Sequence, residues 1–249
     1  MNSHIVPFEG VDVVADFRQT LRPWLNPVHP DACDVAMTAA QTRERPVIVF
    51  DLGGVLIDWN PRHLYRKLFD DETLMEWFLE EVCHEAWNLE QDRGRSFAEA
   101  IEEAALRHPD QRAMIEAYHA RWGEMLAGPI EGSVAILEEL AAAGYELHAL
   151  TNWSAETFPI ARPRFAFLGL FRTILVSAEE RLIKPDARIF QLLLERIAHP
   201  AQRCVYIDDS APNVAAAAAL GFDAIAFTTP PALRAALALR GLLAAAEQA

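Results

Sequence analysis

The stretch that decides the fold reads Val47-Ile48-Val49-Phe50-Asp51-Leu52-Gly53-Gly54-Val55-Leu56. Its first four residues are apolar and mostly β-branched, a composition typical of a strand that is buried on both faces of a parallel sheet. The apolar run stops at Asp51, and the two glycines that follow predict a tight turn at the carboxyl end of this strand. The sequence therefore places a carboxylate where a buried strand opens into a turn.

Four further apolar runs have the character of this strand, and helical patterns separate them. The runs cover residues 146–151, 173–177, 204–208 and 224–228, and the helical patterns include residues 132–143, 187–198 and 213–220. Strands that alternate with helices form βαβ units, in which a parallel sheet is covered by helices on both faces. We therefore predict an α/β fold with a Rossmann-like parallel sheet.

A long insertion of different character separates the first two predicted strands. It has no clear strand, and apolar residues recur at helical spacing over residues 64–69, 74–82, 97–106 and 114–125. An all-helical domain inserted into the α/β core explains this pattern. The predicted domains are an N-terminal extension without assigned chemistry, a core in two pieces and a helical insert, with boundaries at residues 1–45, 46–61 with 130–249, and 62–129.

Composition and charge exclude several classes of protein. The net charge of −14 argues against sequence-independent nucleic-acid binding, which requires a basic face. Cys33, Cys83 and Cys204 form no closely spaced pair, which argues against a zinc site or a disulfide framework and favours a reducing cytoplasm. No apolar run reaches the roughly 18 residues of a membrane span, and no secretory signal is recognisable. We expect a cytoplasmic monomer or homodimer without nucleic-acid or membrane partners.

Candidate catalytic residues gather at the carboxyl ends of the predicted strands, where ligands bind in open α/β sheets. These residues are Asp51, Thr151, Asn152, Lys184, Asp208 and Asp209. A single strand-end aspartate more often caps a turn, but carboxylates that converge repel one another and require a cation, for which Mg²⁺ is suited. Asp51 could then attack a phosphoryl group, while Thr151 donates a hydrogen bond to it and Lys184 neutralises charge.

Four motifs in order resemble those of the haloacid dehalogenase superfamily of hydrolases. They read Asp51-Leu52-Gly53-Gly54-Val55-Leu56, Leu150-Thr151-Asn152, Lys184-Pro185-Asp186 with Phe190, and Tyr206-Ile207-Asp208-Asp209 with Asn213. The resemblance covers about residues 47–228, and the helical insert lies where the helical cap of that superfamily's first cap class is found. Because all four motifs occur in order on the expected elements, the resemblance is specific.

The resemblance implies a magnesium-dependent phosphohydrolase that acts on a small phosphorylated metabolite through an aspartyl-phosphate on Asp51. It also implies that Mg²⁺ is bound by Asp51, Asp208 and the backbone carbonyl of Gly53. Asp209 would act on the metal through water or from the second shell, and Asn213 would lie near the lysine. Asn152 would help to bind phosphate through its backbone N–H.

Position 53 departs from the superfamily pattern. Phosphatases of the superfamily usually carry a second aspartate there, which protonates the leaving group, and this chain has Gly53. General acid catalysis typically accelerates a reaction by about 10²- to 10⁴-fold, so the loss of this aspartate would lower the rate substantially. A subgroup that resembles sugar-1-phosphate phosphatases shares this start, and this chain looks most like that subgroup. Either the leaving group needs less protonation, or Asp58, His84 or water supplies the proton.

Two other functions compete with the phosphatase. Metal-independent 2-haloacid dehalogenases also lack the second aspartate and attack carbon with the same nucleophile. They lack the paired acids of the fourth motif, however, and the presence of Asp208 and Asp209 favours phosphoryl transfer. The second alternative is a catalytically silent relative that binds a ligand or partner through its cap, which Gly53 would explain.

Substrate contacts are expected from residues 83–95, a polar and aromatic segment between two helical patterns. By resemblance this segment is the cap loop that faces the active site, and Trp87, Asn88 and Arg93 are its candidate contacts. A solvated corner with one packed tryptophan is an equally good interpretation of the same residues. Trp59 and Trp153 follow the first two strands and are expected to border the mouth of the pocket.

Overall fold

The computed structural model describes residues 45–244. The predicted N-terminal extension therefore lies outside the described residues, apart from Arg45. Among residues 45–244, no helix combines the length and the apolar character that crossing a membrane requires.

A five-stranded parallel sheet forms the core, as predicted. Its strands are β1 (Val47–Phe50), β4 (Glu146–Thr151), β5 (Thr173–Val176), β6 (Cys204–Asp208) and β7 (Asp223–Ala226), in the order β5-β4-β1-β6-β7. The central strand β1 pairs with β4 on one side and with β6 on the other, all in parallel. The residues that follow β1, β4 and β6 therefore emerge at the same edge of the sheet.

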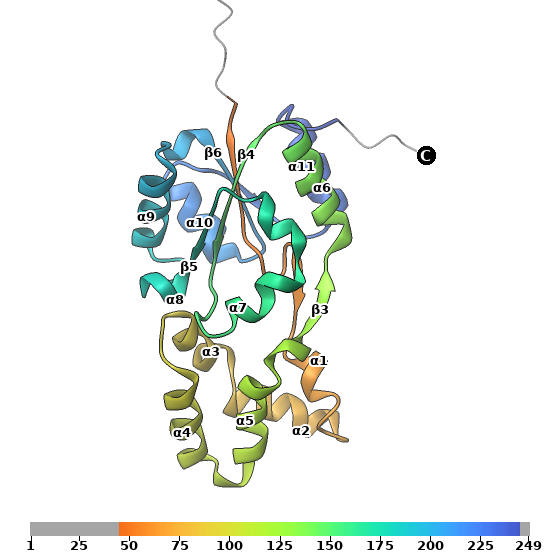
Figure 1. Ribbon diagram of the computed structural model, residues 1–249, viewed down its shortest axis with the longest axis vertical. Coiled ribbons are helices and arrows are strands. Elements are labelled where there is room, and N and C mark those ends of the chain that lie inside the picture. The colour runs from red at the N-terminus through yellow and green to blue at the C-terminus, as the bar shows by residue number, and fades with distance from the viewer. Residues whose placement is uncertain (1–44, 245–249) are drawn as a thin grey trace, which may run out of the picture. The chain divides into compact units, whose positions relative to one another are not determined.

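Helices cover both faces of this sheet (Figure 1), which confirms the predicted fold class. One face carries α6 (Glu131–Ala142) and α11 (Pro230–Leu239), and the other carries α9 (Ala187–Ile197) and α10 (Ala211–Ala219). Successive residues of β1 point to opposite faces. Ile48 and Phe50 pack in the same cluster as α6, whereas Val47 and Val49 pack with α9. Both faces of β1 are buried, which is why the strand is apolar throughout.

The remaining core segments are short. They are α7 (Phe158–Ala161), α8 (Ser177–Glu180) and the 3₁₀ turns η4 (Arg162–Arg164), η5 (Ala166–Leu170) and η6 (Ala201–Arg203). The segment from α7 to η5 fills the connection between β4 and β5 and adds Phe158, Phe165 and Phe167 to the cluster on the α6 face. It thereby closes that face of the sheet beside the helical insert.

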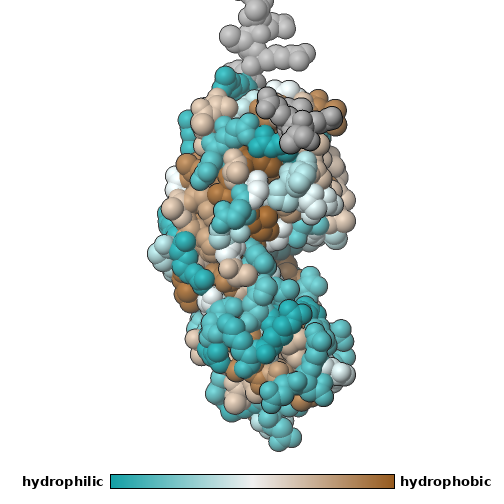
Figure 2. Space-filling view, turned by 90° about the vertical axis from the view of Figure 1, so that its right-hand side faces the viewer, coloured by the Kyte–Doolittle hydropathy of each residue, from teal (hydrophilic) through white to brown (hydrophobic). Residues whose placement is uncertain are grey.

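The insert is the predicted helical cap. Its elements are α1 (Arg62–Tyr65), α2 (Glu72–Trp77), the π-helix η1 (Phe78–Val82), α3 (Glu85–Asp92), α4 (Phe97–Arg107), η2 (Pro109–Gln111), α5 (Arg112–Ala120) and η3 (Trp122–Met125). Aromatic side chains of Tyr65, Phe78, Phe97 and Tyr118 pack against one another inside it. Polar side chains cover most of the face of the cap that Figure 2 shows at the lower end of the molecule.

Two predictions about the insert are wrong. The segment around residue 88 is not a loop but helix α3, whose N-terminus is capped because His84 Nδ1 accepts the backbone N–H of Trp87 at 3.1 Å. A strand is also present on each side of the cap: β2 (Ile57–Trp59) pairs antiparallel with β3 (Leu126–Pro129). These strands are only three and four residues long. Because glycine and proline are rare in strands, Gly128 and Pro129 make β3 hard to recognise in the sequence.

Hydrogen bonds fix the cap to the strand ends of the core. The Ser177 hydroxyl, at the end of β5, donates to the backbone carbonyl of Asp92 at 2.6 Å, and the Glu156 carboxylate accepts the backbone N–H of Phe97 at 2.8 Å. Both contacts involve the segment that links α3 to α4. The carboxyl end of α3 is therefore held beside the strand ends where the candidate catalytic residues lie.

Candidate active site

Asp51 stands at the carboxyl end of the central strand. Its carboxylate is 8% exposed and accepts the backbone N–H of Leu52 at 2.7 Å. The turn that follows requires glycine at position 54, where φ is +71° and where an added Cβ would collide with the Asp209 carboxylate. At Gly53, in contrast, an added Cβ would meet nothing within 4 Å. The turn therefore leaves open space beside the nucleophile.

Lys184 is buried between two carboxylates. Its ammonium lies 2.8 Å from Asp51 Oδ2 and 2.7 Å from Asp208 Oδ2, and it also donates to the Leu150 carbonyl at 3.0 Å. The lysine is 2% exposed, so these three oxygens take the place of water around the ammonium. One positive charge is thus shared by two buried carboxylates.

A network of donors holds Asp208. The amide of Asn213 donates to both carboxylate oxygens, at 3.1 and 3.2 Å, and the Ser210 backbone N–H donates to Oδ1 at 2.8 Å. The Tyr206 hydroxyl donates to Oδ2. Asn213 thus donates to the same Oδ2 that Lys184 contacts, and it supports a carboxylate that is itself fully buried.

Three carboxylates form a group that fits a hard cation. One oxygen each from Asp51, Asp208 and Asp209 can be chosen so that all three lie within 4.8 Å of one another. Among the described residues, Lys184 is the one cation that pairs with this group, through Asp51 and Asp208, so the group keeps an excess of negative charge. Oxygen ligands with excess negative charge are what Mg²⁺ prefers.

The pKa values of these groups reflect their burial and mutual repulsion. Burial, opposed by Lys184 and assisted by Asp208, raises the pKa of Asp51 to about 7. Burial acts to raise the pKa of Asp208 too, but Lys184 and the other donors hold that pKa below its ordinary value. The pKa of Lys184 is raised because the two carboxylates outweigh its burial. The charged lysine is thus stable inside the site.

Asn152 organises the lysine loop. Its side-chain oxygen accepts the Lys184 backbone N–H at 2.8 Å, and its amide donates to the Lys184 carbonyl at 3.1 Å. Both polar ends of the side chain are engaged, so a role in binding phosphate is left to its backbone N–H. Thr151 is 1% exposed and ends β4 beside β1, within the same sheet edge.

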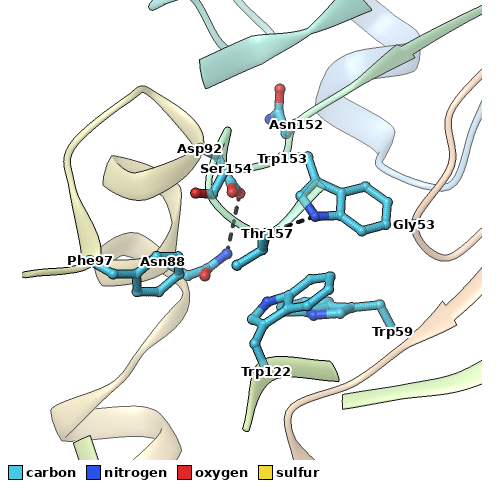
Figure 3. Close-up of a pocket in the computed structure, with 10 residues that line it drawn as sticks. All are labelled: Gly53, Trp59, Asn88, Asp92, Phe97, Trp122, Asn152, Trp153, Ser154 and Thr157. Atoms are coloured by element: carbon cyan, nitrogen blue, oxygen red, sulfur yellow. Dashed lines mark hydrogen bonds between the residues drawn. The ribbon is translucent and has the colours of Figure 1, made fainter. Parts of the chain in front are cut away.

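A pocket opens beside this cluster. Its lining residues come from both the core and the cap (Figure 3): Gly53, Trp59, Asn88, Asp92, Phe97, Trp122, Asn152, Trp153, Ser154 and Thr157. Figure 3 shows the ring systems of Trp59, Trp122 and Trp153 gathered on one side, and Asn88 and Asp92 on another. The expectation that Trp59 and Trp153 border the pocket agrees with this geometry.

The three cap residues predicted to contact substrate separate in the structure. Asn88 lines the pocket, whereas Trp87 is 3% exposed and donates its indole N–H to the Ala100 carbonyl at 3.3 Å. Trp87 packs against Phe97 and Tyr118 in the centre of the cap, so its prediction as a substrate contact is wrong. Arg93 is exposed, lies 3.5 Å from Glu90 and does not line this pocket, so its role as a substrate contact stays a prediction.

Five pocket residues were not singled out by the sequence: Asp92, Phe97, Trp122, Ser154 and Thr157. Trp122 begins a 3₁₀ turn, and Asp92 ends helix α3 with its side chain buried in the pocket wall. Of the sequence-derived proton donors, Asp58 is exposed and pairs with His63 at 3.0 Å, and His84 lines a neighbouring pocket that shares Trp59, Asn88 and Asp92 with this one. Helical spacing is the one signal that links Asp92 to the site, since it stands four residues after Asn88.

Asp92 carries an electrostatic cost that a stability measurement can detect. Burial raises its pKa to about 7, against the effect of a backbone hydrogen bond from Ser154. The folded-state pKa lies above the unfolded value of about 3.9, so the stability from this group is complete below about pH 4 and is lost as the pH rises through about 7. We expect Asp92→Asn to unfold at higher urea concentration than the wild type at pH 8, with the gap closing towards pH 4.

The difference between the folded and unfolded pKa values of Asp92 sets an upper limit of roughly 4 kcal/mol on the difference in the free energy of unfolding between Asp92→Asn and the wild type at pH 8. Glu90→Gln is the matched control, because Glu90 is an exposed carboxylate on the same helix, and we expect no pH-dependent gap for it. A gap for Asp92→Asn that is constant from pH 4 to pH 8 would contradict the raised pKa.

Comparison with known protein families identifies the family of this chain. The model of the haloacid dehalogenase-like hydrolases matches residues 46–221. The chain belongs to this family. The hydrolase is also 28% identical to the sesquiterpene phosphatase astK of Aspergillus oryzae over 185 residues, which cover 72% of this chain and 88% of that protein.

Solved structures share the fold of this hydrolase. A HAD family enzyme of Bacteroides thetaiotaomicron, solved as a magnesium complex, has a TM-score of 0.60 at 19% identity, over 74% of this chain and 94% of that one. The L-2-haloacid dehalogenase of Xanthobacter autotrophicus has a TM-score of 0.54 at 15% identity, over 80% and 84%. The same fold is thus found in an enzyme that was solved with magnesium and in a dehalogenase. The chemistry of this hydrolase therefore has to be argued from its own residues.

Proposed function

We propose that the protein is a magnesium-dependent phosphohydrolase that acts on a small phosphorylated metabolite. The observation that carries the proposal is the group of three carboxylates of Asp51, Asp208 and Asp209, in which Asp51 and Asp208 share the ammonium of Lys184. A dehalogenase would be hindered by an extra carboxylate group that attracts a cation, because a cation masks the nucleophile. A phosphate monoester, which brings its own negative charge, requires that cation.

Each residue then has a definite task. Asp51 attacks phosphorus in line with the leaving oxygen and becomes an aspartyl-phosphate, which water hydrolyses in a second step. Lys184 offsets negative charge on the nucleophile and on the transferring group, and Thr151 with the backbone N–H of Asn152 hydrogen-bonds phosphate oxygens. Asp51, Asp208, Asp209 and the Gly53 carbonyl would hold Mg²⁺, which supplies charge neutralisation between nucleophile and phosphate.

The pocket limits the organic part of the substrate. Trp59, Trp122 and Trp153 contribute apolar indole surface to the pocket wall; Trp59 is partly exposed, whereas Trp122 and Trp153 are 3% and 5% exposed. Such surfaces bind either the apolar face of a sugar ring or a hydrocarbon chain. The resemblance of the sequence to sugar-1-phosphate phosphatases points to the first, and the similarity to a sesquiterpene phosphatase points to the second. Sugar 1-phosphates and terpenyl monophosphates are therefore the two substrate classes to compare.

The direct test is hydrolysis of para-nitrophenyl phosphate by the purified protein, with Mg²⁺ or with a chelator. We expect turnover with Mg²⁺ that disappears in chelator and returns when Mg²⁺ is added back. Release of halide from 2-chloropropionate serves as the parallel assay for the dehalogenase alternative. Halide release that persists in chelator, without phosphate release, would overturn the proposed function. Absence of both activities, with binding of a phosphate analogue, would leave the silent relative as the better interpretation.

A further inference from the structure

Cleavage of a phosphate ester leaves an oxygen that has to be protonated unless the leaving group is unusually acidic. The turn after the nucleophile offers no group for this, because Gly53 has no side chain and the space beside it is open. A side chain that supplies this proton in place of water would therefore have to reach the leaving oxygen from another wall of the pocket.

Asp92 is the one residue with a titratable side chain among the described residues that line this pocket. It belongs to the cap, and it shares the pocket with Gly53 and Asn152 from the core. The pocket that receives the organic part of the substrate beside Asp51 thus contains a single candidate donor. Asp92 was not among the proton donors that the sequence suggested.

The structure holds Asp92 firmly in place. Its side chain is buried, and its Oδ2 accepts the amide of Asn88 at 3.2 Å. Asn88 is fixed in turn by the hydroxyl of Tyr118, which donates to it at 3.0 Å, and Ser177 anchors the backbone of Asp92. No lysine, arginine or histidine pairs with this carboxyl group within the described part of the chain. An unpaired buried carboxyl group is costly as an anion, which favours its protonated form.

We propose that Asp92 is the catalytic acid that protonates the leaving oxygen, in place of a donor at position 53. This inference rests on the proposed phosphohydrolase function. As Asp51 bonds to phosphorus, the bond from phosphorus to the ester oxygen breaks, its electron pair stays on that oxygen, and the oxygen takes the proton of Asp92. In the second step the Asp92 carboxylate takes a proton from the attacking water, phosphate leaves, and Asp51 is regenerated.

The charges around Asp92 suit both steps. Three groups influence it: the Asp51 carboxylate raises its pKa, whereas Lys184 and the Ser154 backbone hydrogen bond lower it. Burial is the largest influence, so the pKa is raised to about 7. A group with a pKa near the operating pH can both give and accept a proton, as an acid that later acts as a base must.

The test compares two substrates of nearly the same shape that differ in the acidity of the leaving group. Phenyl phosphate releases phenol, whose pKa is about 10, while para-nitrophenyl phosphate releases a much more acidic phenol. We expect Asp92→Asn to lower kcat/KM for phenyl phosphate by about 10²-fold or more and to change that for the nitrophenyl ester little. Since kcat/KM reports only the steps up to ester cleavage, it is not affected by the later role of Asp92 as a base in hydrolysis of the aspartyl-phosphate.

Two further variants sharpen the comparison. Glu90→Gln alters an exposed carboxylate on the same helix and should leave kcat/KM for both substrates unchanged. The double variant Gly53→Asp with Asp92→Asn places a carboxyl group in the open space beside the nucleophile, and recovery of phenyl phosphate hydrolysis would support the assignment. The pH profile of kcat/KM for phenyl phosphate should also lose its fall at high pH in Asp92→Asn.

An equal fall of kcat/KM for both substrates would overturn the proposal, because it would show that Asp92 positions the cap and does not supply a proton. Retention of full phenyl phosphate turnover in Asp92→Asn would overturn it as well. These outcomes leave the phosphohydrolase function intact, since the wild type still hydrolyses both esters. A wild type that hydrolyses neither ester would overturn the proposed function and the role of Asp92 with it.

Discussion

Asp51→Asn is expected to lower turnover of an aryl phosphate by at least about 10⁴-fold. The carboxylate lies at the end of the central strand, next to Lys184, and one oxygen each of Asp51, Asp208 and Asp209 lies within 4.8 Å of the others. An amide oxygen is too weak a nucleophile to displace the leaving group, so no covalent intermediate should form. Acid-quenched wild type should gain the mass of one phosphoryl group, and the variant should not.

The control for this variant is Asp209→Asn. Asp209 is exposed and belongs to the same group of carboxylates, yet it is assigned an action on the metal and not on phosphorus. We expect a loss of about 10- to 10²-fold, largely recovered at high Mg²⁺ concentration, with the phosphoryl-enzyme still detectable. Turnover by Asp51→Asn comparable with that of Asp209→Asn would contradict the assignment of the nucleophile.

The convergence of the candidate site residues can be predicted from the sequence, because the topology of the fold brings them together. Asp51, Thr151 and Asp208 each end a strand, and neighbouring parallel strands end at one edge of the sheet, so their convergence follows once the strands are recognised. Lys184 lies on a loop, and its place between two carboxylates follows from charge, since burial of Asp51 and Asp208 together requires a cation.

The pocket could not be predicted in the same way, because the packing of the cap decides which residues line it. Consecutive residues of a helix point about 100° apart, so Trp87 and Asn88 point in different directions, whereas Asn88 and Asp92 share a face. The choice between these faces depends on contacts distant in sequence, such as those of Trp87 with Tyr118. Trp122 enters the pocket through the end of the cap, which no local pattern marks.

Lys184→Met is the second variant with a large expected effect, and it acts on stability as well as activity. Asp51 and Asp208 lose the ammonium that they share, and breaking a buried ion pair by removing one partner typically costs about 3–5 kcal/mol. We expect a loss of this size in the free energy of unfolding, measured with urea in chelator. Turnover in Mg²⁺ should fall by about 10²- to 10³-fold, because charge on the transferring phosphoryl group is no longer offset.

The chain provides a matched control, since Lys67 is its only other lysine. Lys67 pairs with Glu124 at 2.9 Å, but both side chains are exposed, and such pairs contribute at most about 1 kcal/mol. Lys67→Met should therefore change little. Mg²⁺ should stabilise Lys184→Met more than the wild type, because the added cation replaces part of the lost positive charge between the carboxylates. If Mg²⁺ stabilised the two proteins equally, Lys184 and the metal would not act on the same carboxylates, and the proposed catalytic arrangement would be wrong.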